Sequence, residues 1–102
     1  MSYNYTLDGA LKLLISNAKI STLTRIERGR KMDFDIELTD LENLWNIQNG
    51  RCYHSGIPMN YDRNEWRVSI ERLDNDLGYI KLNVVLCCLE FNTYILLILL
   101  YV

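Results

Sequence analysis

The sequence has few of the residues that mark specialised classes of protein. It contains one proline, one histidine and three cysteines, two of which are adjacent. An odd number of cysteines argues against a secreted disulfide scaffold and favours a reducing, intracellular setting. The apolar run over 94–102 is far shorter than the roughly 20 residues that cross a bilayer, so we expect no membrane span. The first ten residues lack the basic and apolar regions of a signal peptide.

The length and the charge describe a small domain with an uneven distribution of charge. The 102 residues are enough for a single domain with a small core. The formal net charge is −2, but residues 1–32 carry +4 and residues 33–102 carry −6. This asymmetry suits a protein that grips phosphates at one end and holds a cation at the other. The alternative is an ordinary solvated helix face.

The spacing of apolar residues predicts two helices in the first half of the chain. The first helix is expected over 7–28, with Gly29 as its C-terminal stop. The second is expected over 40–48. Thr39 would cap it, and Glu42 would complete a capping box.

The second half of the chain predicts a hairpin followed by a helix. Alternating side chains favour strands over 66–73 and 79–87, and the pattern is helical from Cys88 onward. We therefore expect an α+β fold. A basic helix and linker over 1–38 would pack with a second unit over 39–102 in one compact domain.

The most informative residues form a series of short motifs. In chain order these are Cys52-Tyr53-His54-Ser55-Gly56, Ser69-Ile70-Glu71-Arg72-Leu73-Asp74, Gly78-Tyr79, Asn83-Val84-Val85-Leu86, and Cys88 with Asn92. They fall on a loop, a strand, a turn, a strand and the start of a helix. The series resembles the HNH nucleases, which have the ββα-metal fold. It is most similar to the phage and large-virus branch, whose first motif reads Ser-x-Asp/Glu-Arg-Ile/Leu-Asp, and it covers about half of the chain.

The resemblance implies a ββα-metal unit that hydrolyses phosphodiester bonds in DNA. By this resemblance Glu71 is the first metal ligand and Asn92 the second. One divalent cation, Mg²⁺ or Mn²⁺, is expected, because hard cations take oxygen ligands and leave room for water and phosphate. Asn83 matches the position whose side chain ties the hairpin loop together.

Arg72 stands where the best-known family pattern has its catalytic histidine. Arginine stays protonated at neutral pH and cannot act as a base, so we expect Arg72 to clamp the phosphate. The branch that the chain resembles also carries arginine there. The candidates for the base are Asp74, which is alternatively a third metal ligand, and a metal-bound hydroxide. His54 is expected to be a solvated loop side chain, and the acidic residues alternatively belong to a solvated turn.

The cysteines predict that the chain has no structural zinc. Many HNH proteins hold zinc with two Cys-x-x-Cys pairs, which here read Cys52-x-x-Ser55 and Cys88-x-x-Phe91. A tetrahedral zinc site needs four nitrogen or sulfur ligands, and Cys52 and Cys88 supply two. We expect the two thiols to lie close together as small apolar groups, with Phe91 in the volume of the zinc.

The basic side chains are expected to bind DNA, in double-stranded form, through its phosphates and without reading its sequence. They are Lys19, Arg25, Arg28, Arg30, Lys31 and Arg67. Such a nuclease would belong to a mobile or homing-type element, and would act in the cytoplasm or nucleus of the host of a phage or virus.

Two other interpretations stay open. The first is a DNA-binding module that kept the HNH fold and lost catalysis, which Arg72 permits. The second is a truncated remnant or a structural protein. In that case the apolar tail over 94–102 would dock on a partner or on another copy of the chain.

Overall fold

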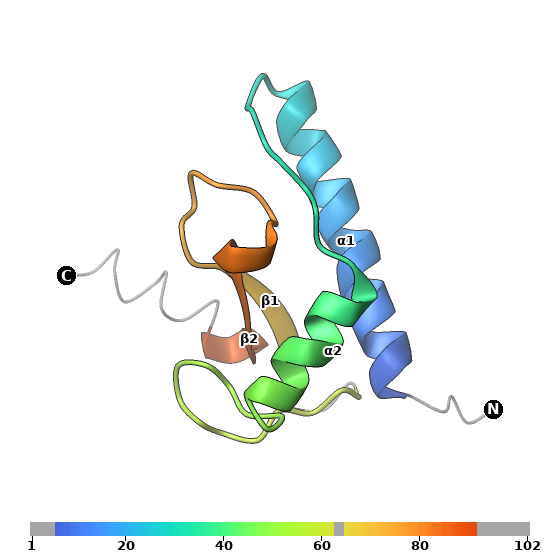
Figure 1. Cartoon of the computed structure of the whole chain (residues 1–102), viewed down its shortest axis with the longest axis vertical. Helices are drawn as coiled ribbons and strands as arrows, with labels where there is room; N and C mark the ends of the chain where they lie inside the picture. The colour runs from blue at the N-terminus through green and yellow to red at the C-terminus, as the bar shows by residue number, and fades with distance from the viewer. Residues whose placement is uncertain (1–5, 63–64, 92–102) are drawn as a thin grey trace.

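The computed structural model describes residues 6–62 and 65–91 and has an α+β fold, as predicted (Figure 1). Two helices come first, and a small antiparallel hairpin follows. The elements are α1 (Leu7–Glu27), α2 (Leu38–Ile47), β1 (Val68–Arg72), the short 3₁₀ helix η1 (Lys81–Asn83) and β2 (Val84–Cys88).

Helix α1 begins and ends at residues with clear local causes. The Oγ1 atom of Thr6 accepts a hydrogen bond from the N–H of Gly9 at 3.0 Å, which caps the first turn. Gly29 ends the helix with a φ of 86°, a conformation that glycine adopts without strain. The N–H of Arg30 then donates to the carbonyl of Arg25 at 3.0 Å, which closes a Schellman turn. The predicted stop at Gly29 is confirmed.

Helix α2 begins two residues earlier than predicted. Its N-cap is Glu37, and the capping box pairs Glu37 with Asp40, so the predicted pairing of Thr39 with Glu42 is wrong. The Oδ2 atom of Asp40 accepts the N–H of Glu37 at 2.7 Å. Glu37 occupies the position that Ser or Thr has in the usual capping box. Its carboxylate and that of Asp40 can each accept a hydrogen bond from a free backbone N–H.

The hairpin is shorter than the predicted strands. Val68 pairs with Cys88 at one end and Arg72 pairs with Val84 at the other. Residues 81–83 form η1, so the returning strand begins at Val84. Residues 89–91 are helical, which agrees with the predicted change of structure.

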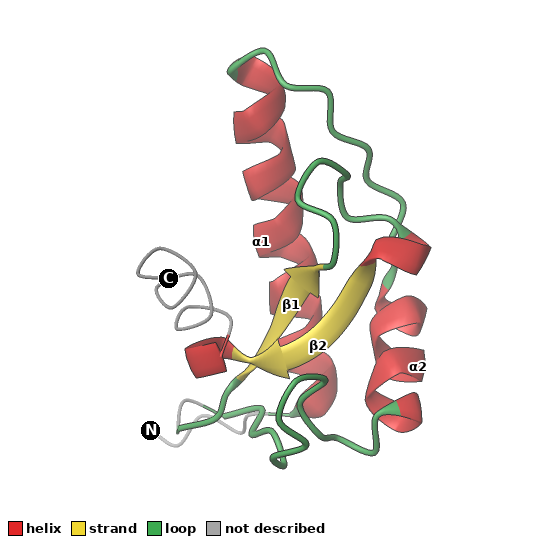
Figure 2. Cartoon of the chain, turned by 90° about the vertical axis from the view of Figure 1, so that its left-hand side faces the viewer, coloured by secondary structure: helices red, strands yellow, loops and turns green. Residues whose placement is uncertain are grey.

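Both predicted units contribute to one core. Figure 2 shows the hairpin between the helices, with β1 on the side of α1 and β2 on the side of α2. The ten residues of the buried cluster are Leu11, Ile36, Leu41, Cys52, Met59, Val68, Val84, Leu86, Cys87 and Cys88. Through Leu11 and Ile36, helix α1 and the linker after it are therefore packed into the same core as the hairpin.

Gln48 joins the end of α2 to the hairpin. Its side-chain amide donates to the carbonyl of Leu86 at 2.8 Å and accepts the N–H of Leu86 at 3.0 Å. The amide thus bonds β2 as a neighbouring strand would, which satisfies backbone groups that are buried there.

The tip of the hairpin is held against the segment between the two helices. The N–H of Asp35 donates to the carbonyl of Tyr79 at 3.0 Å, and the Oδ1 atom of Asp35 accepts the N–H of Lys81 at 2.9 Å. Gly78 permits this approach, because a Cβ there would lie 1.9 Å from the carbonyl oxygen of Asp33.

In the part of the chain that the structure describes, none of the helices has the length and the apolar character needed to cross a membrane.

Candidate active site

Glu71 and His54 meet beside the hairpin. Glu71 lies in β1 opposite Val85, and His54 lies in the loop that follows α2. The Nε2 atom of His54 contacts the Oε2 atom of Glu71, and the two side chains are 27% and 19% exposed. A carboxylate and an imidazole thus face each other at a partly sheltered position that solvent still reaches.

The backbone of the loop determines where His54 lies. The N–H of Cys52 donates to the carbonyl of Ile57 at 2.8 Å, and the N–H of Tyr53 donates to the carbonyl of Leu86 at 3.0 Å. The second bond attaches the loop to β2 immediately before His54. The sequence contained a signal for this placement, because Cys52 and Cys88 were expected to be neighbours. His54, two residues after Cys52, lies in an exposed loop as expected, and its contact with Glu71 goes beyond that expectation.

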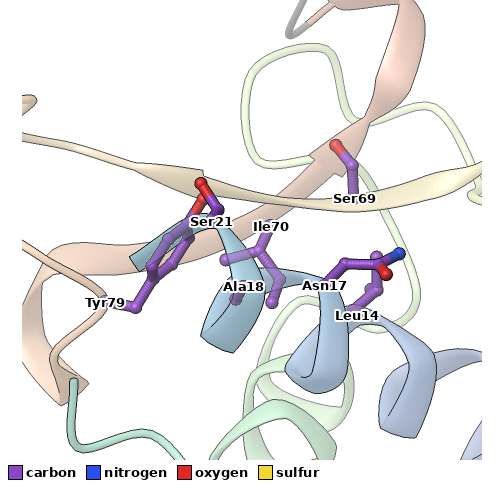
Figure 3. Close-up of a pocket in the computed structure, with 7 residues that line it drawn as sticks. All are labelled: Leu14, Asn17, Ala18, Ser21, Ser69, Ile70 and Tyr79. Atoms are coloured by element: carbon purple, nitrogen blue, oxygen red, sulfur yellow. The ribbon is translucent and has the colours of Figure 1, made fainter. Parts of the chain in front are cut away.

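Arg72 does not lie with Glu71. Successive residues of a strand point to opposite faces, so Arg72 shares the face of Ile70, which points toward α1 (Figure 3). Its Nη1 atom donates to the carbonyls of Asn75 and Leu77, both at 2.9 Å. The guanidinium also lies 5.6 Å from the centre of the Tyr79 ring. Arg72 therefore organises the tip of the hairpin on the opposite face from Glu71.

Asp74 and Asn83 also organise the tip. Asn83 is 5% exposed and donates to the carbonyls of Asp74 and Gly78 at 3.0 and 2.9 Å, which is the loop-closing arrangement expected of it. The Oδ1 atom of Asp74 accepts the N–H of Asp76 at 2.9 Å and stabilises the turn. Within residues 6–62 and 65–91, no group of three or more His, Cys, Asp or Glu side chains is placed to hold a metal ion. Asp74 does not form such a group with Glu71 and His54, and its expected role as base or third metal ligand stays a prediction.

Glu71 and His54 are a pair of donors that could hold a metal ion in an open site. The carboxylate oxygen of Glu71 and the imidazole nitrogen of His54 converge, and two protein ligands leave positions for water and phosphate oxygens. Mn²⁺ accepts an imidazole nitrogen more readily than Mg²⁺, which prefers oxygen ligands. Asn92, the predicted second ligand, lies outside the described residues.

The three thiols belong to the core. The backbone N–H of Cys88 donates to the Sγ atom of Cys52 at 3.3 Å, so the two residues are neighbours as expected. Burial raises the pKa of Cys87 and of Cys88 to about 12. Burial also acts to raise the pKa of Cys52, but hydrogen bonds from Ser55 and from the N–H of Cys88 outweigh it, and the net pKa lies below its usual value. Phe91 packs near Trp66, with 6.0 Å between the ring centres.

The basic side chains predicted to bind DNA occupy more than one place. Arg67 directly precedes β1, whereas the others follow the second half of α1 and the turn after it. The exposed members are Lys19, Arg28, Arg30 and Lys31, and the half-buried members are Arg25 and Arg67. The Nζ atom of Lys19 lies 6.0 Å from the centre of the Phe34 ring.

A hollow of about 250 Å³ lies between α1 and β1. It is lined by Leu14, Asn17, Ala18, Ser21, Ser69, Ile70 and Tyr79 (Figure 3). Its walls carry hydroxyl and amide groups and no carboxylate, imidazole or thiol.

Comparison with known proteins gives one sequence relationship. Over 65 residues, which are 64% of this chain, the sequence is 32% identical to an uncharacterized 29.0 kDa protein in the dda–modA intergenic region of Enterobacteria phage T4. The match spans about a quarter of the phage protein. No family model matches the chain, and no solved structure matches it.

Proposed function

We propose that the chain is a metal-dependent DNA endonuclease of the HNH type. The observation that carries the proposal is the convergence of Glu71 and His54 on a hairpin whose tip is closed by Asn83. The similarity to a phage protein agrees with the viral source that the motifs indicated. The enzyme would then act inside an infected host cell, where its DNA substrate lies.

Glu71 needs a bound cation in order to lie against a DNA phosphate. A carboxylate repels a phosphate diester, so an acidic residue in a DNA-contacting position works only when a cation lies between the two. A divalent cation held there stabilises the charge that develops on the phosphate and on the leaving oxygen. Glu71 would provide the charged oxygen ligand and His54 a nitrogen ligand beside it.

The remaining motif residues would position this pair. Asn83 and Arg72 hold the tip of the hairpin, so the strand that carries Glu71 is fixed at its end. Arg72 is permanently charged and cannot accept a proton from water. Its guanidinium instead orders the loop that would enter a groove of the DNA.

A nicking assay on supercoiled plasmid tests the proposal. The full chain is incubated with Mg²⁺, with Mn²⁺ and with EDTA, beside Glu71→Gln and His54→Gln. Asp76→Asn is the matched control, because Asp76 lies on the exposed tip and its substitution removes one carboxylate from the same hairpin. We expect metal-dependent nicking that Glu71→Gln abolishes, His54→Gln reduces and Asp76→Asn retains.

Two results would contradict the proposal. Full nicking by Glu71→Gln would remove Glu71 from the reaction. A folded protein that binds the plasmid but nicks it with neither metal would be a DNA-binding module with the same hairpin.

A further inference from the structure

Arg25 and Arg30 lie together at the end of α1. The left-handed Gly29 reverses the chain, and the N–H of Arg30 donates to the carbonyl of Arg25 at 3.0 Å. The turn therefore returns Arg30 to the level of Arg25. Four residues before Arg25 is Ser21, and residues four apart lie on the same face of a helix.

This face of α1 points to the tip of the hairpin. Ser21 and Tyr79 line the same hollow between α1 and β1 (Figure 3). Arg72 lies over the ring of Tyr79 at 5.6 Å. Arg72 is therefore close to the end of α1. Burial lowers its pKa, and the charges of Arg25 and Arg30 lower it further, since three like charges disfavour one another.

The three arginines have no compensating anion among the described residues. No ion pair within residues 6–62 and 65–91 involves any of them. The Nη1 atom of Arg25 is buried and has no hydrogen-bond partner there. A buried guanidinium nitrogen without a partner is costly, because arginine is always charged and can only donate. Within the described part of the chain, the arrangement thus lacks an acceptor that carries negative charge.

We propose that Arg25, Arg30 and Arg72 form a binding site for one phosphate group. A phosphate offers several acceptor oxygens, and the planar fork of a guanidinium matches their geometry. Two bonds to loop carbonyls hold the Arg72 guanidinium in place, so the site is ordered before its ligand binds.

The site lies on the opposite face of the hairpin from Glu71. That the phosphate belongs to DNA rests on the proposed function, whereas the anion site itself does not. On DNA, the arginines would take a phosphate other than the one at Glu71. The tip of the hairpin would then have DNA backbone on both of its faces.

Two measurements on the full chain test the site without any cleavage. The first is the thermal midpoint in sodium phosphate against sodium chloride at equal ionic strength. The second is the affinity for a fluorescent DNA duplex in EDTA as the salt concentration is varied. The variants are Arg25→Gln, Arg30→Gln and the double variant, which leave the loop contacts of Arg72 in place. Lys12→Gln is the control, because it removes one exposed positive charge from α1 away from the site.

We expect the double variant to bind the duplex about tenfold more weakly and its salt slope to fall by about one, the value for one lost phosphate contact. Phosphate should raise the thermal midpoint of the wild-type chain and not that of the double variant. Loss of duplex affinity without an effect of free phosphate would assign the site to DNA phosphates alone. A double variant that matches Lys12→Gln in both measurements would overturn the proposal. Neither measurement uses cleavage. A chain that does not nick DNA would therefore contradict the proposed nuclease function and leave the test of the phosphate site unaffected.

Discussion

Asn83 and Asp74 close the tip of the hairpin through a reciprocal pair of hydrogen bonds. The Oδ1 atom of Asn83 accepts the N–H of Asp74 at 2.8 Å, and its Nδ2 atom donates to the carbonyl of Asp74 at 3.0 Å. The Asn83 side chain thus takes the place of backbone hydrogen bonds beyond Arg72 and Val84, the last paired residues of the hairpin, where η1 precedes β2.

Asn83→Ala should destabilise the fold by about 2–4 kcal/mol, because it leaves buried backbone groups without their partners. Urea unfolding of the variant against the wild-type chain measures this change. Asn83→Asp keeps the acceptor oxygen and loses the amide donors. Its free energy of unfolding should therefore lie between those of the wild-type chain and Asn83→Ala. A change below about 0.5 kcal/mol in Asn83→Ala would show that water replaces the side chain.

Gly78→Ala should destabilise the fold by about 3 kcal/mol or more. A methyl group there would lie 1.9 Å from the carbonyl oxygen of Asp33, and backbone cannot move aside cheaply. Gly9→Ala is the matched control, since its added methyl meets only the Thr6 side chain, at 3.1 Å. We expect the control to stay within about 1 kcal/mol of the wild-type chain. Equal stability of the two variants would contradict the close contact between the tip and the segment between the helices.

His54→Gln should weaken the binding of Mn²⁺ by about tenfold or more and that of Mg²⁺ much less. The reason is that Mn²⁺ accepts an imidazole nitrogen, whereas Mg²⁺ prefers oxygen. Titration calorimetry of each metal into the wild-type chain and the variant gives both affinities. Glu71→Gln is the comparison, and it should weaken both metals. Equal losses for the two metals in His54→Gln would show that His54 acts on Glu71 and does not bind the metal.

The stability of the fold should decrease above about pH 9. Burial raises the pKa of Cys87 and Cys88 from 9.0 to about 12, so below pH 9 these two thiols are protonated in both the folded and the unfolded chain. Above it the unfolded chain loses these protons first, and each thiol lowers the free energy of unfolding by about 1.4 kcal/mol per pH unit until pH about 12.

Urea unfolding at pH 7, 9 and 10 measures this dependence. Other groups also titrate in this range, so Cys87→Ala is compared at each pH. The slope of the variant between pH 9 and 10 should be shallower than that of the wild-type chain. Identical slopes would show that Cys87 reaches solvent in the folded state.

The amino-acid sequence was sufficient for the features that depend on neighbours along the chain. Apolar spacing and Gly29 determine where α1 lies, and alternation with the polar turn determines the hairpin. These patterns are local, because helix and turn hydrogen bonds join residues a few positions apart. The motif around Asn83 likewise predicted a closed tip.

The tertiary structure decided which distant side chains meet. His54 and Glu71 are 17 residues apart, and the bonds that join Tyr53 to Leu86 and Cys52 to Cys88 bring the loop to the hairpin. Arg25 and Arg72 lie on elements that are far apart in the chain, and packing of α1 beside β1 brings them close. Strand geometry also separates Arg72 from its neighbour Glu71, although the motif places them side by side. Such contacts depend on how helices and strands pack, which local residue patterns do not specify.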